Sequence, residues 1–221
     1  MPYRRTENVA RRLAARREAI VAAARALAAE GGMAAVQIAP VATRAGIAAG
    51  TVYRYFPSKT ELVAAVIEAV SERELAAMRA AADAAPGLLS ALAAAVTTFA
   101  ARALHQRRLA WAVIAEPVDQ EIDALRLSYR QALAAELERR LAAAVRAGHL
   151  PEQDVRLAAS ALLGALAEGL VGPLAPDAAS TGASREAVQA LTLFALRAVG
   201  IVDARARGLV VQSALPKPDD A

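Results

Sequence analysis

A single lysine in the stretch GTVYRYFPSKTEL, residues 50–62, lies where it can bind a phosphate group. Lys59 directly follows Ser58, which has the side chain of a helix N-cap, and Glu61 completes the capping pattern. Only two of the 26 basic residues are lysines, so the composition favours arginine wherever a cation needs only solvent. The helix dipole mildly disfavours a cation in the first turn. An ammonium that shares one phosphate with the helix amides explains the lysine, and an unpartnered, solvated lysine is the alternative.

The aromatic residues before this lysine can serve both a core and a surface. Each ring of Tyr53 and Tyr55 can close a small core while its hydroxyl stays in water, although ordinary core packing would use the same residues. Phe56 has no hydroxyl, and we assign it to the core.

The longer stretch VATRAGIAAGTVYRYF, residues 41–56, has the pattern of a helix-turn-helix. Gly46 separates two short helices, and Ala42 is small enough for them to cross closely. Thr51 and Tyr55 fall on an outward face, and a helix end with hydroxyls and small residues can enter a major groove. The apolar residues that we expect in the core are Val41, Ile47, Val52 and Phe56.

Residues 18–62 resemble the DNA-binding domain of TetR-family repressors. The resemblance lies in AGIAAGTVYRYFPSKTEL, preceded by IVAAARALAAEGG. It combines the Ala-Gly turn, the Thr-x-Tyr-x-Tyr-Phe run and the Ser-Lys start of the next helix, and it covers about a fifth of the chain. This combination is far more specific than a generic helix-turn-helix pattern.

The resemblance implies a role for each matching position. Thr43 and Arg44 would contact the DNA backbone or a base edge. Tyr53 and Tyr55 would give their hydroxyls to phosphates or bases, and Lys59 would bind a phosphate. The residues that would approach the groove are Ala48, Ala49, Gly50 and Thr51.

Four positions depart from the family pattern. Gln37 enters the first helix of the motif where a Ser or Thr cap is usual, and Pro40 lies in its first turn. Ala48 replaces the usual serine cap of the recognition helix, and Ala28 stands where a core phenylalanine is common. Each lost cap weakens a helix end by ~1 kcal/mol. The departures therefore bear on base specificity and on the stability of the small domain.

The elements that must position these residues are all helical. Ala, Leu, Arg and Glu dominate almost every segment with apolar residues three or four apart, and no long alternation of period two occurs. Glycines and prolines divide the pattern into about nine helices. We expect them at about 16–30, 38–45, 49–55, 58–82, 88–104, 107–115, 119–147, 152–170 and 184–199.

Charge and pattern divide the chain into four segments. They are a basic N-terminal arm (1–15), a helix-turn-helix domain (16–60), a helical ligand-binding and dimerisation domain (61–200) and a partly disordered C-terminal tail (201–221). Residues 1–60 hold ten Arg and Lys against three Glu, whereas the remainder is net negative. A basic surface for a partner therefore belongs at the front of the chain. The arm either follows a phosphate backbone or is a solvated lead-in to the first helix.

The dimerisation role of residues 61–200 is implied by the resemblance, which places the dimer contact on the last two helices. Small residues in LAASALLGALAEGL would allow close helix approach, and AVQALTLFALRAV offers a broad apolar stripe. The candidates are Ala158, Ala161, Ala165, Gly169, Val188, Leu191, Phe194, Ala195 and Ala198. A core within one chain would use the same residues.

The resemblance also implies a ligand pocket among the middle helices. The unusual residues there are His105, Trp111, Glu116 and Tyr129. Glu116 precedes the helix-breaking Pro117, where irregular backbone can line a cavity. The alternatives are structural: a tryptophan on an apolar helix is usually core, and His105 and Glu116 would be solvated.

Composition and motifs argue against several other classes of protein. The chain has no cysteine, so disulfides and thiolate metal sites are excluded. Its two histidines lie on different expected elements, and no HExxH, GxSxG, P-loop or dinucleotide pattern occurs. Its longest uncharged stretch is interrupted by Pro86 and Gly87, so no membrane span is expected. We expect a soluble, cytoplasmic protein without enzyme activity, metal or cofactor.

The sequence therefore predicts a TetR-like homodimeric repressor of a near-palindromic duplex operator. A small apolar or amphipathic effector in the helical domain would release it. Two alternatives stay open: a helical adaptor that never binds DNA, and a DNA-binding regulator that has no ligand.

Overall fold

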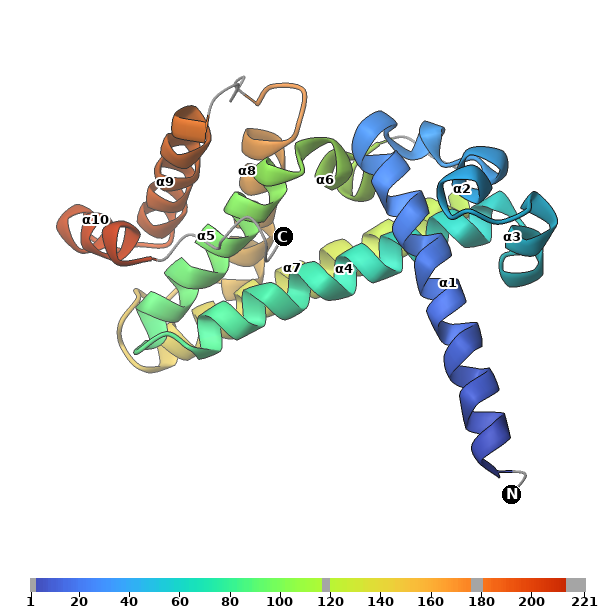
Figure 1. The fold of residues 1–221 in the computed structure, drawn as a ribbon. Helices are drawn as coiled ribbons and strands as arrows, with labels where there is room; N and C mark the ends of the chain where they lie inside the picture. The colour runs from blue at the N-terminus through green and yellow to red at the C-terminus, as the bar shows by residue number, and fades with distance from the viewer. Residues whose placement is uncertain (1–2, 117–119, 176–180, 214–221) are drawn as a thin grey trace.

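The computed structural model describes residues 3–116, 120–175 and 181–213. Within these ranges the chain forms ten α-helices and one short 3-10 helix without a strand, which confirms the all-helical prediction with one helix more than expected (Figure 1). The elements are α1 (Tyr3–Gly31), η1 (Met33–Ala35), α2 (Ile38–Arg44), α3 (Ala49–Tyr55), α4 (Lys59–Asp83), α5 (Leu88–His105), α6 (Arg107–Ile114), α7 (Gln120–Arg146), α8 (Val155–Leu170), α9 (Thr181–Ala198) and α10 (Asp203–Gln212).

The second half of α1 packs with α2 and α3 to form a small three-helix domain. Its core contains Ile20, Val41 and Val52, all fully buried, with Phe56 almost so, while Ile47 is half-buried. The turn between α2 and α3 depends on Gly46, whose φ of 65° lies in the left-handed region that favours glycine. The predicted helix-turn-helix core is therefore present.

Helix α4 carries the chain from this small domain into a larger helical body (Figure 1). It begins where the capping pattern predicts, because the Ser58 hydroxyl accepts a hydrogen bond from the Glu61 amide at 3.1 Å. In the body α4 contacts α5 and α7, and α5 also contacts α9. Among the described residues α5 alone is long and apolar enough to cross a membrane, but it is two-thirds buried within the fold and serves as a core helix.

The two ends of the chain differ from the expected arm and tail. Helix α1 begins at Tyr3, so the basic arm belongs to the first half of a helix that projects from the body, with side chains exposed from Asn8 onward (Figure 1). Ala, Arg and Leu are strong helix formers, and no breaker separates this half from the rest. Within the segment assigned to the tail, α10 packs Ala206 and Leu209 against α9 and α5. The rest of the expected tail, residues 214–221, lies outside the described residues.

Candidate nucleic-acid interface and ligand cavity

The residues predicted to contact DNA lie on α2, α3 and their flanks, from Thr43 to Lys59, and we call them together the recognition face. Thr51 and Tyr55 are half-buried, and the ring of Tyr55 packs against the core. Tyr53 is 52% exposed, so a contact to a partner is open to it. The other members of the recognition face are exposed: Thr43, Arg44, Ala48, Ala49, Gly50 and Lys59.

Two arginines lie over aromatic rings beside this face. The Arg54 guanidinium lies 5.8 Å from the centroid of the Tyr55 ring, and that of Arg17 lies 5.1 Å from the Phe56 ring. Such cation–π contacts hold a long side chain in a defined direction. They therefore keep two positive charges close to the recognition face.

Lys59 lies at the N-terminus of α4 without an ion pair to any residue that the structure describes. The first amides of an α-helix have no partner inside the helix, and here only that of Glu61 is taken up by Ser58. The ammonium and the remaining amides can therefore bind one anion together, as the composition suggested.

Arg44 differs from Lys59 because it already has a partner. Its guanidinium binds the carboxylate of Glu30, at the end of α1, through two hydrogen bonds of 2.6 and 2.9 Å. These hydrogen bonds lower the pKa of Glu30, so the carboxylate stays charged. Sequence reasoning missed this pair, and Arg44 reaches a DNA phosphate only by leaving Glu30.

The helix ends show the consequence of the unusual residues at the caps. Neither Gln37 at the start of α2 nor Ala48 at the start of α3 provides a side-chain cap. The Gln37 amide instead donates a hydrogen bond to the Ala34 carbonyl at 3.0 Å. Both helix starts therefore depend on packing against the rest of the small domain.

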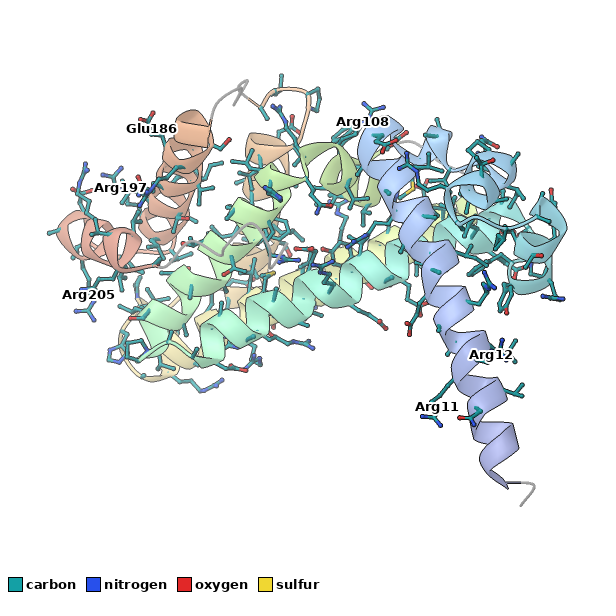
Figure 2. All side chains as sticks on the ribbon, in the orientation of Figure 1. Arg11, Arg12, Arg108, Glu186, Arg197 and Arg205 are labelled. Atoms are coloured by element: carbon teal, nitrogen blue, oxygen red, sulfur yellow. The ribbon has the colours of Figure 1, made fainter. Side chains whose placement is uncertain are left out.

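The first half of α1 extends the positive surface. Arg11 and Arg12 are exposed on the projecting part of the helix, far from the larger body (Figure 2). The Arg11 guanidinium donates to the Asn8 side chain at 2.6 Å, a contact within the same helix. Because α1 is a continuous helix, it holds these arginine side chains at defined positions along its axis.

The larger body contains an apolar cavity of about 30 Å³ among α4, α5, α6 and α7. This volume holds about one water molecule. Of the four predicted ligand residues, only Tyr129 lines it. Its other walls are Val70, Glu74, Phe99, Arg102, Ala103, Gln106, Leu109, Ala110, Val113 and Ile114.

The other three candidates lie elsewhere. His105 is exposed at the end of α5, and Trp111 is half-buried against the core on α6, next to a lining residue. Glu116 accepts a hydrogen bond from the Met33 amide at 3.1 Å and so binds the small domain. The expected cavity role of these side chains therefore finds no support in their positions.

Glu116 forms part of a connection between α6 and the end of α1, which we call the α6 contact. Arg108, at the other end of α6, donates to the Gly31 carbonyl at 3.2 Å (Figure 2). Between these two points Gly32 has a φ of 74°, and a Cβ added there would lie 2.6 Å from a carboxylate oxygen of Glu116. The same helix provides cavity residues on its other face, so it joins the cavity to the small domain.

Two buried arginines near the cavity were not predicted from the sequence. Arg102 is 5% exposed and binds Glu74 through hydrogen bonds of 2.6 and 2.8 Å. Arg126 is 4% exposed and donates to the carbonyls of Ala112 and Glu116 at the end of α6. Burial lowers the pKa of Arg126 below the usual arginine value. Arginine is common along the whole chain, so its frequency gave no signal of these two positions.

The predicted dimer residues divide between surface and core. Val188 and Ala195 are buried within the chain, and Gly169 serves a close contact with Leu191, because an added Cβ would lie 2.9 Å from the Leu191 side chain. Ala161, Phe194 and Ala198 are exposed, Phe194 by 53%. Ala158, Ala165 and Leu191 are half-buried. An apolar surface on α8 and α9 is therefore left open, with Leu157 67% exposed near one end.

The fold and the recognition face define a helix-turn-helix protein with a separate helical body. Residues 20–66 match the family model of bacterial regulatory proteins of the tetR family. Over these residues the helix-turn-helix is of the tetR-family type.

Individual relatives agree with this placement. A 58-residue segment is 50% identical to the HTH-type transcriptional repressor KstR of Rhodococcus jostii strain RHA1, and it covers 26% of this chain and 27% of that protein. The match thus spans about a quarter of the relative's length.

Two solved structures share the whole fold. RolR in complex with its ligand resorcinol superposes with a TM-score of 0.66 at 24% identity, over 94% of this chain and 98% of that one. TylP, a TetR regulator from Streptomyces fradiae, gives a TM-score of 0.64 at 24% identity, over 93% of both chains.

Proposed function

We propose that this protein is a transcriptional repressor that binds a near-palindromic operator as a homodimer and is released by a small molecule. Two recognition helices would enter successive major grooves about one helical turn apart. The observation that carries the proposal is the ammonium of Lys59 at the start of α4, which has no ion pair to any described residue and lies in a small domain of net positive charge with an exposed Tyr53.

Electrostatics favour nucleic acid as the partner of the recognition face. The positive charge of the chain is concentrated in residues 1–60, and α1 carries exposed arginines away from the acidic body. Lysines and arginines that neutralise phosphates release counterions, which makes affinity steeply dependent on salt. An acidic protein partner would show a weaker salt dependence and no preference for a DNA sequence.

The dimer proposal depends on the open apolar surface of α8 and α9. Exposed residues of low polarity there include Leu157, Ala161 and Phe194. A large exposed apolar patch on a protein commonly marks an interface. A two-fold axis through this surface would give the symmetry that a palindromic operator requires.

The ligand would act through linkage between the cavity and DNA. Helix α6 lines the cavity, and Arg108 on this helix and Glu116 just after it bind the small domain. Opening of the cavity would shift α6 and α4 and change the separation of the two recognition helices. Because linkage is reciprocal, ligand and operator must weaken each other's binding by the same factor.

A regulator without a ligand is the second candidate, and the small size of the cavity favours it. About 30 Å³ is too little for any effector larger than water without movement of the walls. In that case the core would be closed, and DNA binding would respond to no small molecule.

Selection of tight-binding duplexes from a random pool tests the proposal most directly. Enrichment of an inverted repeat would support a symmetric dimer that reads DNA. No enrichment at low salt would leave the recognition face as a structural feature and favour the helical adaptor. On the selected operator, between 50 and 200 mM salt, we expect affinity to fall by roughly 10³- to 10⁵-fold if six to ten phosphates are contacted.

A substitution on the recognition helix then tests base reading. Thr51→Ala removes a hydroxyl from a half-buried position on α3. We expect it to change the preference among operator variants with single base changes. Equal weakening on all variants would show that Thr51 does not read bases.

A further inference from the structure

The cavity is lined by a tyrosine whose hydroxyl can bind a molecule inside it. Tyr129 is 5% exposed and lines the cavity from α7. Among the described residues the fully buried side-chain polar atom without a partner is Nε of Arg126, so the Tyr129 hydroxyl is accessible from the cavity that its residue lines. Burial raises the pKa of Tyr129, so the hydroxyl keeps its proton and can donate it. A hydroxyl that faces an apolar cavity is satisfied by whatever molecule occupies the cavity, either a water or a ligand.

The charged groups beside the Tyr129 hydroxyl limit which chemical class of molecule can bind it. Glu74 and the buried Arg102 line the same cavity, and both charges act on the Tyr129 hydroxyl. Arg102 donates two hydrogen bonds to Glu74, and the opposite charges of the two side chains cancel. The cavity thus presents one carboxylate and one guanidinium, paired with each other, within apolar walls. The Glu74 side chain remains 21% exposed, which leaves its oxygens open to a further hydrogen bond.

An anionic ligand fits this arrangement poorly. A carboxylate that bound Arg102 would compete with Glu74 for the buried guanidinium and would bring a second negative charge beside Glu74. Arg25 and Arg73 lie close enough to act on each other electrostatically, but neither lines the cavity. A neutral hydroxyl needs no such exchange, because it can accept from Tyr129 and donate to Glu74 while the ion pair stays intact.

We propose that the cavity takes a neutral, mainly apolar small molecule with at least one hydroxyl group, held between the Tyr129 hydroxyl and the Glu74 carboxylate. This ligand class rests on the proposed ligand-responsive function. The apolar part of the molecule would lie against Val70, Phe99 and Val113. Because the closed cavity is so small, the molecule must push apart its walls, including α6 with its contact to the small domain.

Three probes of matched shape test the ligand class on the full-length protein. They are p-cresol, toluene and 4-methylbenzoate, which differ only in carrying a hydroxyl, no polar group or a carboxylate. Isothermal titration calorimetry should give a Kd for p-cresol about tenfold lower than for toluene, the ratio expected from one good hydrogen bond. Equal affinity for p-cresol and toluene, tighter binding of 4-methylbenzoate, or no binding of p-cresol would overturn the proposal.

A pair of variants tests whether Tyr129 is the residue responsible for the preference for p-cresol over toluene. Tyr129→Phe removes only the hydroxyl and should abolish most of the preference for p-cresol over toluene. Tyr53→Phe makes the same change on an exposed ring and should retain it. A preference that survives in Tyr129→Phe would also overturn the proposal, whereas the comparison of probes on the unsubstituted protein does not depend on how the variant folds.

The test of the ligand class and the test of the proposed repressor function can fail independently. Selection of an operator together with no preference for p-cresol would refute the ligand class and leave the repressor proposal standing. A preference for p-cresol without any selected operator would refute DNA recognition and leave the cavity assignment intact.

Discussion

The small domain and the larger body use arginine in opposite ways. Arg11 and Arg12 are exposed on α1, where their charge faces solvent and can act on a distant polyanion. In the body, Arg102 and Arg126 are at least 95% buried and bind a carboxylate or carbonyl groups. The same residue type therefore serves long-range attraction in one region and helix packing in the other.

The buried charges of the body form local networks that the small domain lacks. Glu136 is 2% exposed and accepts hydrogen bonds from Arg79, Arg139 and Arg140, which joins α4 to α7. Arg140 also binds Asp83 at the end of α4, at 2.6 Å. The helices that enclose the cavity are thus held by charge pairs, and the recognition face is left free of them except at Arg44.

The largest predicted effect comes from breaking the network of the body. Glu136→Ala removes one of the two carboxylates that bind the mostly buried Arg140, and we expect a loss of about 3 kcal/mol in the free energy of unfolding. This value is at the low end of the range for breaking a buried ion pair, because Arg79 and Arg139 are about half exposed and water can solvate their charges once Glu136 is removed. Urea denaturation measures it. Glu138→Ala, two residues away and without an ion pair to any described residue, should change stability little.

The same network predicts a dependence on pH. Burial alone would raise the pKa of Glu136, but hydrogen bonds from three arginines hold it below the usual glutamate value. A lowered pKa in the folded state adds stability above the unfolded pKa of about 4.3, and this stability is lost as the pH falls through the folded value. Between about pH 5 and 3 the Glu136→Ala variant should lose stability less steeply. Parallel curves would contradict the assigned role.

A second prediction tests the connection between the two regions. Gly32→Ala must place a Cβ at a φ of 74° and against Glu116, so it should weaken both local backbone and the α6 contact. We expect a loss of about 1–3 kcal/mol in the free energy of unfolding. Gly208→Ala is the matched control, because Gly208 lies within α10 with nothing near the added Cβ, and it should stabilise the protein slightly. Similar values for the two variants would contradict the α6 contact.

This contact shows why part of the site could not be predicted from the sequence. Met33 and Glu116 are 83 residues apart, and no local pattern relates them, so Glu116 was assigned to the pocket instead. The helix-turn-helix was predictable because its turn, cap and core lie within a few residues of one another. Gly46, Ser58 and Phe56 each have a local reason for their position.

The helices were predicted better than their ends and partners. Apolar residues three or four apart, together with glycine and proline breakers, predicted the bounds of α2 to α9 within about three residues, because both are local signals. Helix α10 was missed because only Ala206 and Leu209 bury in it, too few for a clear apolar stripe. Buried Arg102 and Arg126 look like solvated residues in an arginine-rich sequence until their partners are known.

A third prediction measures how much one free cation contributes to DNA binding. Lys59→Ala removes the ammonium at the start of α4 without breaking an ion pair to any described residue. It should weaken binding to every duplex and reduce the slope of log K against log salt by about one unit. Arg205→Ala on α10, exposed and distant from the recognition face (Figure 2), should leave the slope unchanged. An unchanged slope in Lys59→Ala would refute the phosphate contact.

The smallest predicted effect concerns Arg44, the member of the recognition face that forms an ion pair with a carboxylate, as the arginines of the larger body do. Glu30→Gln removes the negative charge that holds Arg44 through two hydrogen bonds. Because the pair is exposed, stability should barely change. The released guanidinium is then available to DNA, so affinity for the selected operator should rise a few-fold at low salt and the salt slope should steepen. Fluorescence anisotropy on a labelled operator measures both. Weaker binding in Glu30→Gln would instead mean that the Glu30 pair holds Arg44 in the position that DNA requires.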